Sequence, residues 1–258
     1  MDLKIEGLRV LVTAGAGGIG LAIARAFVAE GARVHTCDVD EMALSALASS
    51  DPVIGWSHCD VSDRTAVKKL FTEATEKLGG LDVLVNNAGV AGPTSKVEEM
   101  NPEDWDRCLE ICLTGQFNCT RLAVPLLRNS KNASIVNLSS AAGKLGFAMR
   151  APYAAAKWGV IGFTKSLSIE LGPDNIRVNA ILPGLVAGDR QRRVLEAKAQ
   201  QRGISFAQME RTAFSYTSIK DYVTPQQIAD QILFLCSPRG KTISGQAIAV
   251  DGDTQMLG

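Results

Sequence analysis

The chain has 258 residues, 46% of them hydrophobic, and its 27 basic residues balance 27 acidic ones, so its formal net charge is zero. This length and composition suit one large α/β domain with a substantial core. The neutral charge balance disfavours nucleic acid and anionic membrane surfaces as partners, which leaves a small molecule as the expected partner.

Two features of the sequence favour a cytoplasmic protein. No apolar run approaches the roughly 20 residues that cross a bilayer, and residues 1–7 lack the charged-then-apolar layout of a secretion signal. The six cysteines form no CxxC pair and fall mostly in apolar stretches, as reduced, buried thiols do. We therefore expect a cytoplasmic location, no membrane partner and no disulfide.

Strand-like and helix-like segments alternate along the chain. Helical periodicity covers stretches such as 18–30 and 62–78, and apolar strand-like runs occur at 8–13, 32–37, 53–61, 81–86, 134–138, 177–182 and 247–250. This alternation predicts βαβ units. We expect a single-domain α/β Rossmann fold over residues 1–258, a doubly wound, seven-stranded parallel sheet with helices on both faces.

Capping residues support several of these boundaries. Gly31 follows the first helix as a C-cap, and Ser62 is predicted to be the N-cap of the helix over 62–78. Pro102 is expected in the first turn of a helix that contains 105–127, because proline lacks only an N–H that is unpaired there anyway.

The first strand runs directly into a glycine-rich turn that opens a helix. Such a turn lets the backbone approach a pyrophosphate, and the helix N-terminus supplies free N–H groups and positive potential. The alternative is a turn that serves helix packing alone. We expect a cofactor site that includes Gly15, Gly17, Gly18, Ile19 and Gly20.

Asp38 ends the second predicted strand, eighteen residues after Gly20. A carboxylate at this point can accept hydrogen bonds from the adenosine ribose hydroxyls and would repel a 2′-phosphate. Neither Gly17 nor Val39 is basic, so nothing nearby favours NADP. The sequence therefore predicts NAD as the cofactor.

Tyr153 and Lys157 stand four residues apart on a predicted helix, with Ser140 thirteen residues before the tyrosine. Residues four apart share one helix face, and an ammonium beside a phenol stabilises its phenolate. A phenolate can take a proton from a substrate. The alternative is an ordinary tyrosine and lysine on a half-exposed helix.

Two histidines and two cysteines on neighbouring predicted strands make a metal site conceivable. The ligand spacing of structural zinc is absent, however, and strand histidines are usually core residues. We expect no metal. The residues in question are His35, Cys37, His58 and Cys59.

Residues 185–223 form a long basic segment between the sixth strand and the last helix. Segments of this length in a compact domain are usually functional, and we predict a helical substrate lid. Arg150, three residues before Tyr153, would lie near the mouth of the pocket, and arginine matches a carboxylate in two-pronged geometry. We predict substrate binding by Arg150, helped by Arg190 and Arg192 from the lid.

A series of motifs over nearly the whole chain resembles those of the short-chain dehydrogenase/reductase family. Residues 13–20 are similar to its TGxxxGIG turn, and Asn86-Asn-Ala-Gly89 to its NNAG strand end. Ser140, Tyr153 and Lys157 match its catalytic residues. Further matches are Asp60-Val61, Pro183-Gly184 after Arg177-Val-Asn-Ala180, Ser244-Gly-Gln246 and Val250-Asp-Gly252.

The resemblance implies a role for each matched residue. Ser140 would bind the substrate oxygen, Tyr153 would act as general base or acid, and Lys157 would bind the nicotinamide ribose. Tyr153 and Lys157 thereby also contact the cofactor. The other implied cofactor contacts are Asp60 and Val61 at the adenine, and Asn87, Ala88, Gly89, Pro183, Gly184 and Val186.

The chain departs from the family pattern at three positions. Ala14 stands where the first glycine usually sits, and we expect the turn to survive with a small backbone adjustment. Cys112 replaces an asparagine that holds a water connecting the catalytic lysine to solvent, and a thiol should hold that water poorly. Asn118 lies about 240° further around a regular helix and cannot substitute. Gly188 replaces a threonine that binds the nicotinamide amide.

The expected function is interconversion of a secondary alcohol and a ketone with NAD. Few aromatic residues and a basic lid favour a small polar hydroxy acid or sugar acid, such as a 2-keto-3-deoxy sugar acid. One alternative is a 3-oxoacyl thioester reductase. Another is a non-catalytic, nucleotide-sensing protein. The resemblance, together with small residues on the Tyr153 helix, implies a homotetramer.

Overall fold

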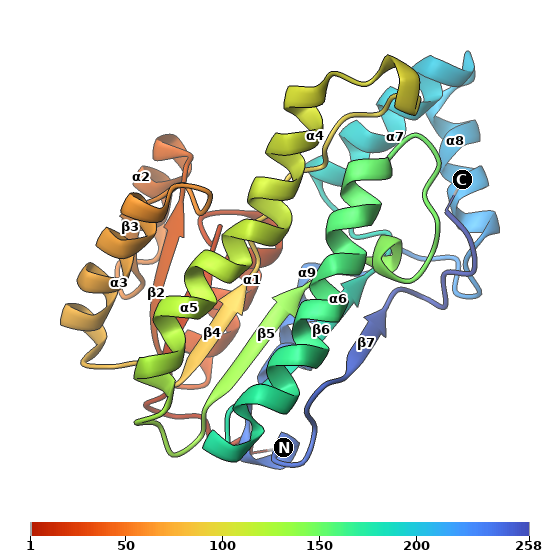
Figure 1. Cartoon of the computed structure of the whole chain (residues 1–258). Helices are drawn as coiled ribbons and strands as arrows, with labels where there is room; N and C mark the ends of the chain where they lie inside the picture. Colours follow the sequence, from red (N-terminus) through yellow and green to blue (C-terminus); the bar gives the residue numbers. More distant parts are fainter. Residues whose placement is uncertain (1, 258) are drawn as a thin grey trace.

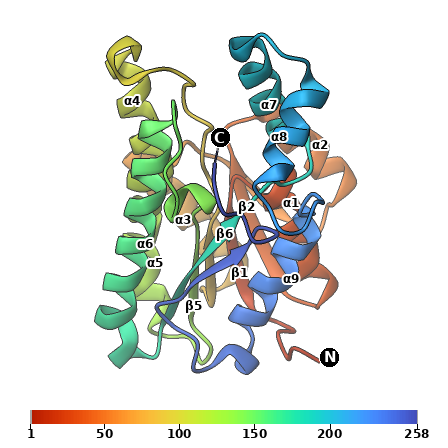
Figure 2. The ribbon, with the colours of Figure 1, turned by 90° about the vertical axis from the view of Figure 1, so that its right-hand side faces the viewer.

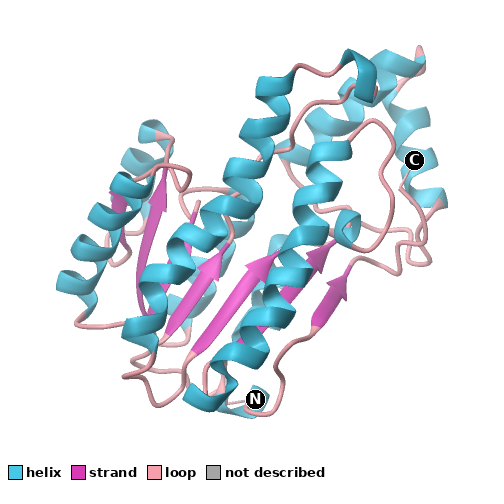
Figure 3. Ribbon diagram, in the orientation of Figure 1, coloured by secondary structure: helices cyan, strands magenta, loops and turns pink. Residues whose placement is uncertain are grey.

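The computed structural model describes residues 2–257, and its seven strands form one parallel sheet (Figure 1, Figure 3). The strand order is β3-β2-β1-β4-β5-β6-β7. The chain adds strands outward on one side of β1 and then crosses to add β4 on the other side, so the topological switch point lies between β1 and β4. The predicted fold class is confirmed. The strands are β1 (Arg9–Thr13), β2 (Arg33–Asp38), β3 (Gly55–His58), β4 (Val83–Asn86), β5 (Ser134–Leu138), β6 (Arg177–Pro183) and β7 (Ala247–Val250).

Helices cover both faces of the sheet (Figure 2). The side chains of β1 alternate between two apolar clusters, with Val10 and Val12 in one and Leu11 in the other, as the strand period of two requires. The first cluster joins α1 (Gly18–Ala29), α2 (Glu41–Ser50) and α9 (Pro225–Cys236). The second joins α3 (Arg64–Leu78), α5 (Gly115–Leu127) and α6 (Ala151–Leu171).

The predicted helix around 105–127 is interrupted by a π-helical turn. It consists of α4 (Pro102–Leu109), the π turn Glu110–Thr114, and α5. Pro102 occupies the first turn of α4, as predicted. π turns inside helices occur frequently at functional sites. This one contains Cys112.

Two predicted boundaries are wrong at the edge of the sheet. The N-cap of α3 is Asp63, whose carboxylate accepts the Thr65 N–H, while Ser62 donates its hydroxyl to Asp60. β3 is shorter than the predicted 53–61, because it is the edge strand and pairs only with β2. Gly31 does follow α1 in a left-handed conformation (φ 80°), as a C-cap glycine does.

Residues 185–223 contain two helices that rise above the carboxyl ends of the strands. They are α7 (Asp189–Arg202) and α8 (Phe206–Ser215), which pack together around Leu195, Ala199 and Met209. In Figure 2 they stand across from α4 and the start of α6. The division into one catalytic domain, 1–258, with 185–223 as a substrate lid, stays a prediction.

The six cysteines are all buried and free. His35 is also buried and bonds Ser57 through its Nε2, whereas His58 is exposed, contrary to the core position expected for it. Among residues 2–257, no three His, Cys, Asp or Glu side chains gather as a metal site would require. The same residues include no helix with the length and apolarity of a membrane span.

Candidate active site

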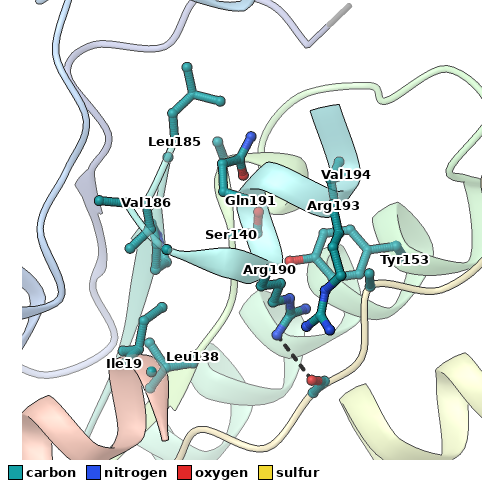
Figure 4. A pocket seen from close by; sticks show the side chains of 18 of the residues that line it. Ile19, Leu138, Ser140, Tyr153, Leu185, Val186, Arg190, Gln191, Arg193 and Val194 are labelled. Carbon is teal, nitrogen blue, oxygen red and sulfur yellow. Dashed lines mark hydrogen bonds between the residues drawn. The ribbon is translucent and has the colours of Figure 1, made fainter. Parts of the chain in front are cut away.

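A cleft of about 620 Å³ runs along the carboxyl edge of the sheet, where ligands bind in open α/β folds. It is bounded by strand ends, the first turn of α1, the start of α6 and the lid (Figure 4). Most of the predicted site residues line it. They are Gly17, Gly18, Ile19, Gly20, Asp38, Asn87, Gly89, Ser140, Arg150, Tyr153, Lys157, Pro183, Gly184, Val186 and Arg190.

The glycine turn between β1 and α1 leaves one side of its backbone open. A Cβ at Gly17 or Gly18 would meet no atom within 4 Å, and Gly18 has a left-handed φ of 52°. A Cβ at Gly20 would instead collide with the Ala14 carbonyl and the Asn87 side chain. Gly20 therefore serves packing, while Gly17 and Gly18 offer free backbone at a helix N-terminus, which suits a pyrophosphate.

Ala14 keeps the turn intact, as expected, by taking a left-handed conformation with φ 51°. This conformation costs an alanine roughly 1–2 kcal/mol. The Asn87 side chain holds it by donating to the carbonyl oxygens of Thr13 (2.9 Å) and Ala14 (3.0 Å). Gly15 lies outside the cleft lining, and a side chain there would collide with Thr36.

Asp38 lies at the end of β2 and lines the cleft. Its carboxylate accepts the N–H groups of Ala16 (3.2 Å), Val39 (2.8 Å) and Asp40 (3.2 Å), so its position is fixed relative to the glycine turn. Carboxylate, glycine turn and open helix N-terminus together fit an adenosine ribose followed by a pyrophosphate.

Besides Gly15, three predicted cofactor residues do not line the cleft, namely Asp60, Val61 and Ala88. Asp60 forms an ion pair with Arg107 (2.6 Å); although burial raises its pKa, hydrogen bonds from Arg107 and Ser62 hold the net pKa below its usual value. Val61 is buried against Gly115, and Ala88 donates its N–H to Thr13. Their contacts with a cofactor remain predictions.

Ser140, Tyr153 and Lys157 meet at one wall of the cleft. Ser140 follows β5 and caps a 3-10 turn, while the other two lie on α6. Lys157 is 3% exposed, donates to the Leu138 carbonyl oxygen (2.7 Å) and places Nζ 5.7 Å from the centroid of the Tyr153 ring. The structure thus brings together the three residues predicted for proton transfer.

Cys112 bonds both backbone groups of Val90, the residue after Gly89. Its Sγ accepts the Val90 N–H (3.4 Å) and donates to the Val90 carbonyl (3.5 Å). The thiol therefore ties the π turn to the end of β4 beside Lys157. Asn118 is engaged elsewhere, with its amide nitrogen on the Val61 carbonyl (3.0 Å), so it does not take over this position.

Gly188 precedes α7 with a φ of 135°, a conformation that side chains rarely adopt. Just before it, Val186 pairs with Val223 in a short parallel bridge. The hydrogen bonds of that bridge use the Ala187 N–H and the Leu185 carbonyl. The backbone groups of Val186 itself are thus directed away from the bridge.

Arg150 is 2% exposed, more deeply buried than the sequence suggested. It follows Met149, which has a left-handed φ of 63°, and it donates from Nη2 to the Ala91 carbonyl. Its Nε is buried without a hydrogen-bond partner, and its Cζ lies 5.3 Å from the Tyr153 ring centroid. Burial lowers the pKa of Arg150, Tyr153 opposes this, and Arg190 lowers it further.

Of the two lid arginines predicted to bind substrate, one lines the cleft and the other lies at the surface. Arg190 lines the cleft and donates to the Gly89 carbonyl oxygen (3.0 Å; dashed line in Figure 4). Arg192 does not line the cleft, because it lies about 200° around α7 from Arg190 and pairs with Glu196 at the surface (2.8 Å). Its predicted role in substrate binding is not supported by this placement.

Sequence reasoning missed several cleft residues, chiefly Lys198 and Arg193 of the lid and Phe147 before α6. Lys198 could have been found from helical spacing, because positions 190, 194 and 198 share one helix face. Phe147 and the C-terminal Met256 and Leu257 carry no motif. Leu257 reaches the cleft through a bridge with Phe147 that only tertiary packing sets.

Comparison with known proteins agrees with this geometry. A family model described as enoyl-(acyl carrier protein) reductase matches residues 14–253. The chain is 36% identical to 3-oxoacyl-[acyl-carrier-protein] reductase FabG of Thermotoga maritima, over 97% of this chain and 98% of that protein. It is 33% identical to D-beta-hydroxybutyrate dehydrogenase of Cupriavidus necator, over 96% and 98%.

Two further matches extend the comparison. Trans-4-hydroxycyclohexanecarboxylate dehydrogenase of Sinomonas cyclohexanicum is 38% identical, over 94% of this chain and 90% of that protein. The crystal structure of a single-residue variant of actinorhodin polyketide ketoreductase with NADPH superposes with a TM-score of 0.88 at 34% identity, covering 94% of this chain and 95% of that one.

Proposed function

The chain belongs to the short-chain dehydrogenase/reductase family of oxidoreductases, which act on CH–OH groups with a nicotinamide cofactor, and from this premise we propose that it is specific for NAD and for a small carboxylate-bearing substrate. The reaction would interconvert a secondary alcohol and a ketone. Hydroxy acids and sugar acids, 2-keto-3-deoxy sugar acids among them, are the proposed substrates.

The observation that carries the substrate proposal is the buried guanidinium of Arg150. Its Nε lacks a partner and its Cζ lies 5.3 Å from the Tyr153 ring centroid. A buried cationic donor without a partner is costly, so a bound anion beside it would be strongly favoured. Two of the matched relatives are named for hydroxy acids, which supports the same class.

The proposed proton transfer uses the three residues at the cleft wall. Ser140 holds the substrate oxygen by a hydrogen bond, and Tyr153, as phenolate, takes the hydroxyl proton of the alcohol. Lys157 stabilises the phenolate and binds the nicotinamide ribose. In the reverse direction Tyr153 returns the proton to the forming alcohol. The bound nicotinamide supplies hydride acceptance and donation at the same carbon.

The preference for NAD rests on Asp38. Its fixed carboxylate can accept hydrogen bonds from both ribose hydroxyls and repels a 2′-phosphate. The amide of the nicotinamide would bind the outward backbone groups of Val186, in place of a side chain at Gly188.

A 3-oxoacyl thioester reductase is the second candidate, because the Thermotoga maritima relative carries that name. Such reductases usually favour NADP, which Asp38 disfavours. The alternative of a non-catalytic sensor is not retained, since the family comparison identifies an oxidoreductase.

We also propose a homotetramer in the cytoplasm. The surface of α6 exposes Trp158 (53%) and Ile169 (80%) beside small residues such as Ala155 and Gly162, and large exposed apolar side chains of this kind favour association. Light scattering of the purified protein gives the number of subunits directly.

The decisive experiment measures NADH formation with a panel of alcohols. The panel contains 3-hydroxybutyrate, trans-4-hydroxycyclohexanecarboxylate, their methyl esters, a 2-keto-3-deoxy sugar acid and galactose, each with NAD and with NADP. We expect the acids to exceed their esters in kcat/KM, and NAD to exceed NADP. Preference for the esters would overturn the proposal. A parallel assay of NADPH consumption with a 3-oxoacyl thioester would also overturn it if that reduction had the higher kcat/KM.

A further inference from the structure

The C-terminal segment, residues 251–257, connects two walls of the substrate end of the cleft. It follows β7 directly, and three of its residues line the cleft. On the lid side, Thr217 forms an antiparallel bridge with Thr254. On the side of Ser140, Phe147 forms a parallel bridge with Leu257. The position of this segment therefore affects both walls.

An ion pair joins the segment to the chain that follows Ser140. The Nζ of Lys144 lies 2.8 Å from Oδ2 of Asp251, the first residue of the segment. The side chain of Asp251 is 4% exposed, whereas that of Lys144 is 36% exposed. A carboxylate that is buried this deeply needs a compensating charge, because its removal from water is costly. Lys144 supplies this charge, and neither residue lines the cleft.

Lys144 and Ser140 are held by the same short 3-10 turn, Ala141–Gly143. Ser140 is its N-cap, and the Ser140 Oγ accepts the N–H of Ala142 (3.2 Å). Lys144 is its C-cap, and the Lys144 N–H donates to the carbonyl oxygen of Ala141 (3.1 Å). A displacement of Lys144 is therefore passed to Ser140 through a single turn.

Asp251 is held on its own side by neighbouring backbone. Its Oδ1 accepts the N–H of Asp253 (3.0 Å), and its carbonyl oxygen accepts the hydroxyl of Thr254 (2.7 Å). Gly184, which follows β6 and lines the cleft, packs so closely that a Cβ there would lie 2.7 Å from the Asp251 Cα. Asp251 therefore lies where the end of β6 meets the C-terminal segment.

We propose that the ion pair between Lys144 and Asp251 positions the substrate end of the cleft, by holding the 3-10 turn of Ser140 and the C-terminal segment together. Lys144 and Asp251 are positioning residues, because they act through Ser140 and through the segment. This inference rests on the proposed function for the place of the substrate and for the choice of substrate in its test.

Loss of the ammonium would leave the Asp251 carboxylate buried without a compensating charge. Such a carboxylate is strongly destabilising unless it reaches water. The segment can hydrate it only by moving, and a moved segment no longer holds Leu257 beside Phe147. The glycine turn after β1 and Asp38 take no part in these contacts. KM for the substrate should therefore rise much more than KM for NAD.

The test compares the parent with Lys144→Met, Lys144→Arg and Asp251→Asn. Steady-state kinetics use NAD and the alcohol of the panel above that the parent oxidises fastest. Hydrogen–deuterium exchange followed by mass spectrometry reports on residues 141–150 and 251–257 without any substrate. The matched control is Arg9→Met. Arg9 begins β1 at the opposite edge of the sheet, and it forms an ion pair of the same length, 2.8 Å, with the largely buried Asp82.

The largest effect is expected in Lys144→Met. Its kcat/KM should fall by about 10- to 100-fold, because a small misplacement of groups around a substrate can cost this much. Residues 141–150 and 251–257 should exchange faster than in the parent, and Lys144→Arg should restore both measurements. Since the two residues act as a pair, the double variant of Lys144→Met and Asp251→Asn should be no worse than Lys144→Met alone.

Either measurement can overturn the inference. It is wrong if both segments of Lys144→Met exchange as in the parent, or if Arg9→Met lowers kcat/KM equally. Faster exchange with unchanged kinetics would also contradict it. If the parent oxidises no alcohol of the panel, the proposed function fails, while the exchange rates still decide whether the pair holds the two segments together. If Lys144→Met fails to fold, Asp251→Asn, which keeps the size of the side chain, gives the same comparison.

Discussion

The two ends of the cleft are built in different ways. At the cofactor end, short local segments supply the site: the glycine turn after β1, the end of β2 and the end of β4. At the substrate end, Phe147, Arg150, Lys198 and Leu257 come from three separate parts of the chain. The cofactor end uses backbone and one carboxylate, whereas the substrate end uses buried cations and an aromatic ring.

This difference suggests which end of the cleft can vary in sequence between relatives. A parallel sheet places its strand ends together whatever the helices carry, so a ligand crevice at this edge follows from the fold. The lid has its own small core around Leu195 and Met209, and Arg190 joins it to the carbonyl oxygen of Gly89. Substrate choice can therefore differ between relatives while the cofactor end stays the same. The following substitutions test that separation.

The largest effect is expected where the two ends meet, at Tyr153. Tyr153→Phe removes the hydroxyl that exchanges the proton, and we expect kcat to fall by at least ~10²-fold. Cofactor affinity, measured by titration with NADH, should be largely kept. A Phe variant as active as the parent would remove Tyr153 from the mechanism.

At the substrate end, Arg150→Ala should raise KM for a carboxylate substrate by about 10- to 100-fold, the value of a charged hydrogen bond. KM for the corresponding methyl ester should change much less. Steady-state kinetics on the acid and ester pair measure both. Equal effects on the two substrates would mean that Arg150 acts through the structure of the Tyr153 region instead.

At the cofactor end, Asp38→Asn keeps an acceptor oxygen for the neighbouring N–H groups but removes the charge. We expect kcat/KM with NADP to rise about 10-fold or more, since a like charge no longer opposes the 2′-phosphate. Glu41→Gln, an acid in the next helix that does not line the cleft, is the control. If Asp38→Asn leaves the ratio of NAD to NADP unchanged, the carboxylate does not select the cofactor.

The smallest effect is expected at Cys112, which supports the cofactor end without lining it. Cys112→Ala loses the two sulfur contacts with Val90. Because a hydrogen bond contributes ~0.5–1.5 kcal/mol, we expect kcat to fall about 2- to 10-fold. Cys112→Asn should retain these contacts and the parent rate. A rate that falls equally in both variants would show that packing of the thiol matters more than its hydrogen bonds.

Most residues that the sequence predicted for the cofactor end line the cleft, because the signals that point to them are local. The geometry of each signal depends on only a few neighbouring positions. The signals are a glycine turn, an acid at a strand end and a pair of residues four apart on a helix. Even the departure at Ala14 was resolved as expected, by a local backbone adjustment. The Cys112 departure was harder to judge, because the π turn and the partner Val90 are visible only in the folded chain.

The substrate end was predicted only in part, for a physical reason that Arg192 illustrates. Residues two apart cannot share a helix face, so Arg190 and Arg192 could not both face the cleft once α7 was helical. Which of the two arginines faces the cleft depends on how α7 is oriented relative to the sheet, and the sequence does not give this orientation. The depth of Arg150 and the approach of Phe147 likewise depend on tertiary packing that no motif encodes.

The C-terminal residues have a practical consequence for handling the protein. Thr254, Met256 and Leu257 line the cleft, and Leu257 is paired with Phe147 beside the two buried cations. An affinity tag or fusion partner attached after them would start near the rim of the cleft. The N-terminal residues lie at the other end of the sheet (Figure 1), so purification handles belong there.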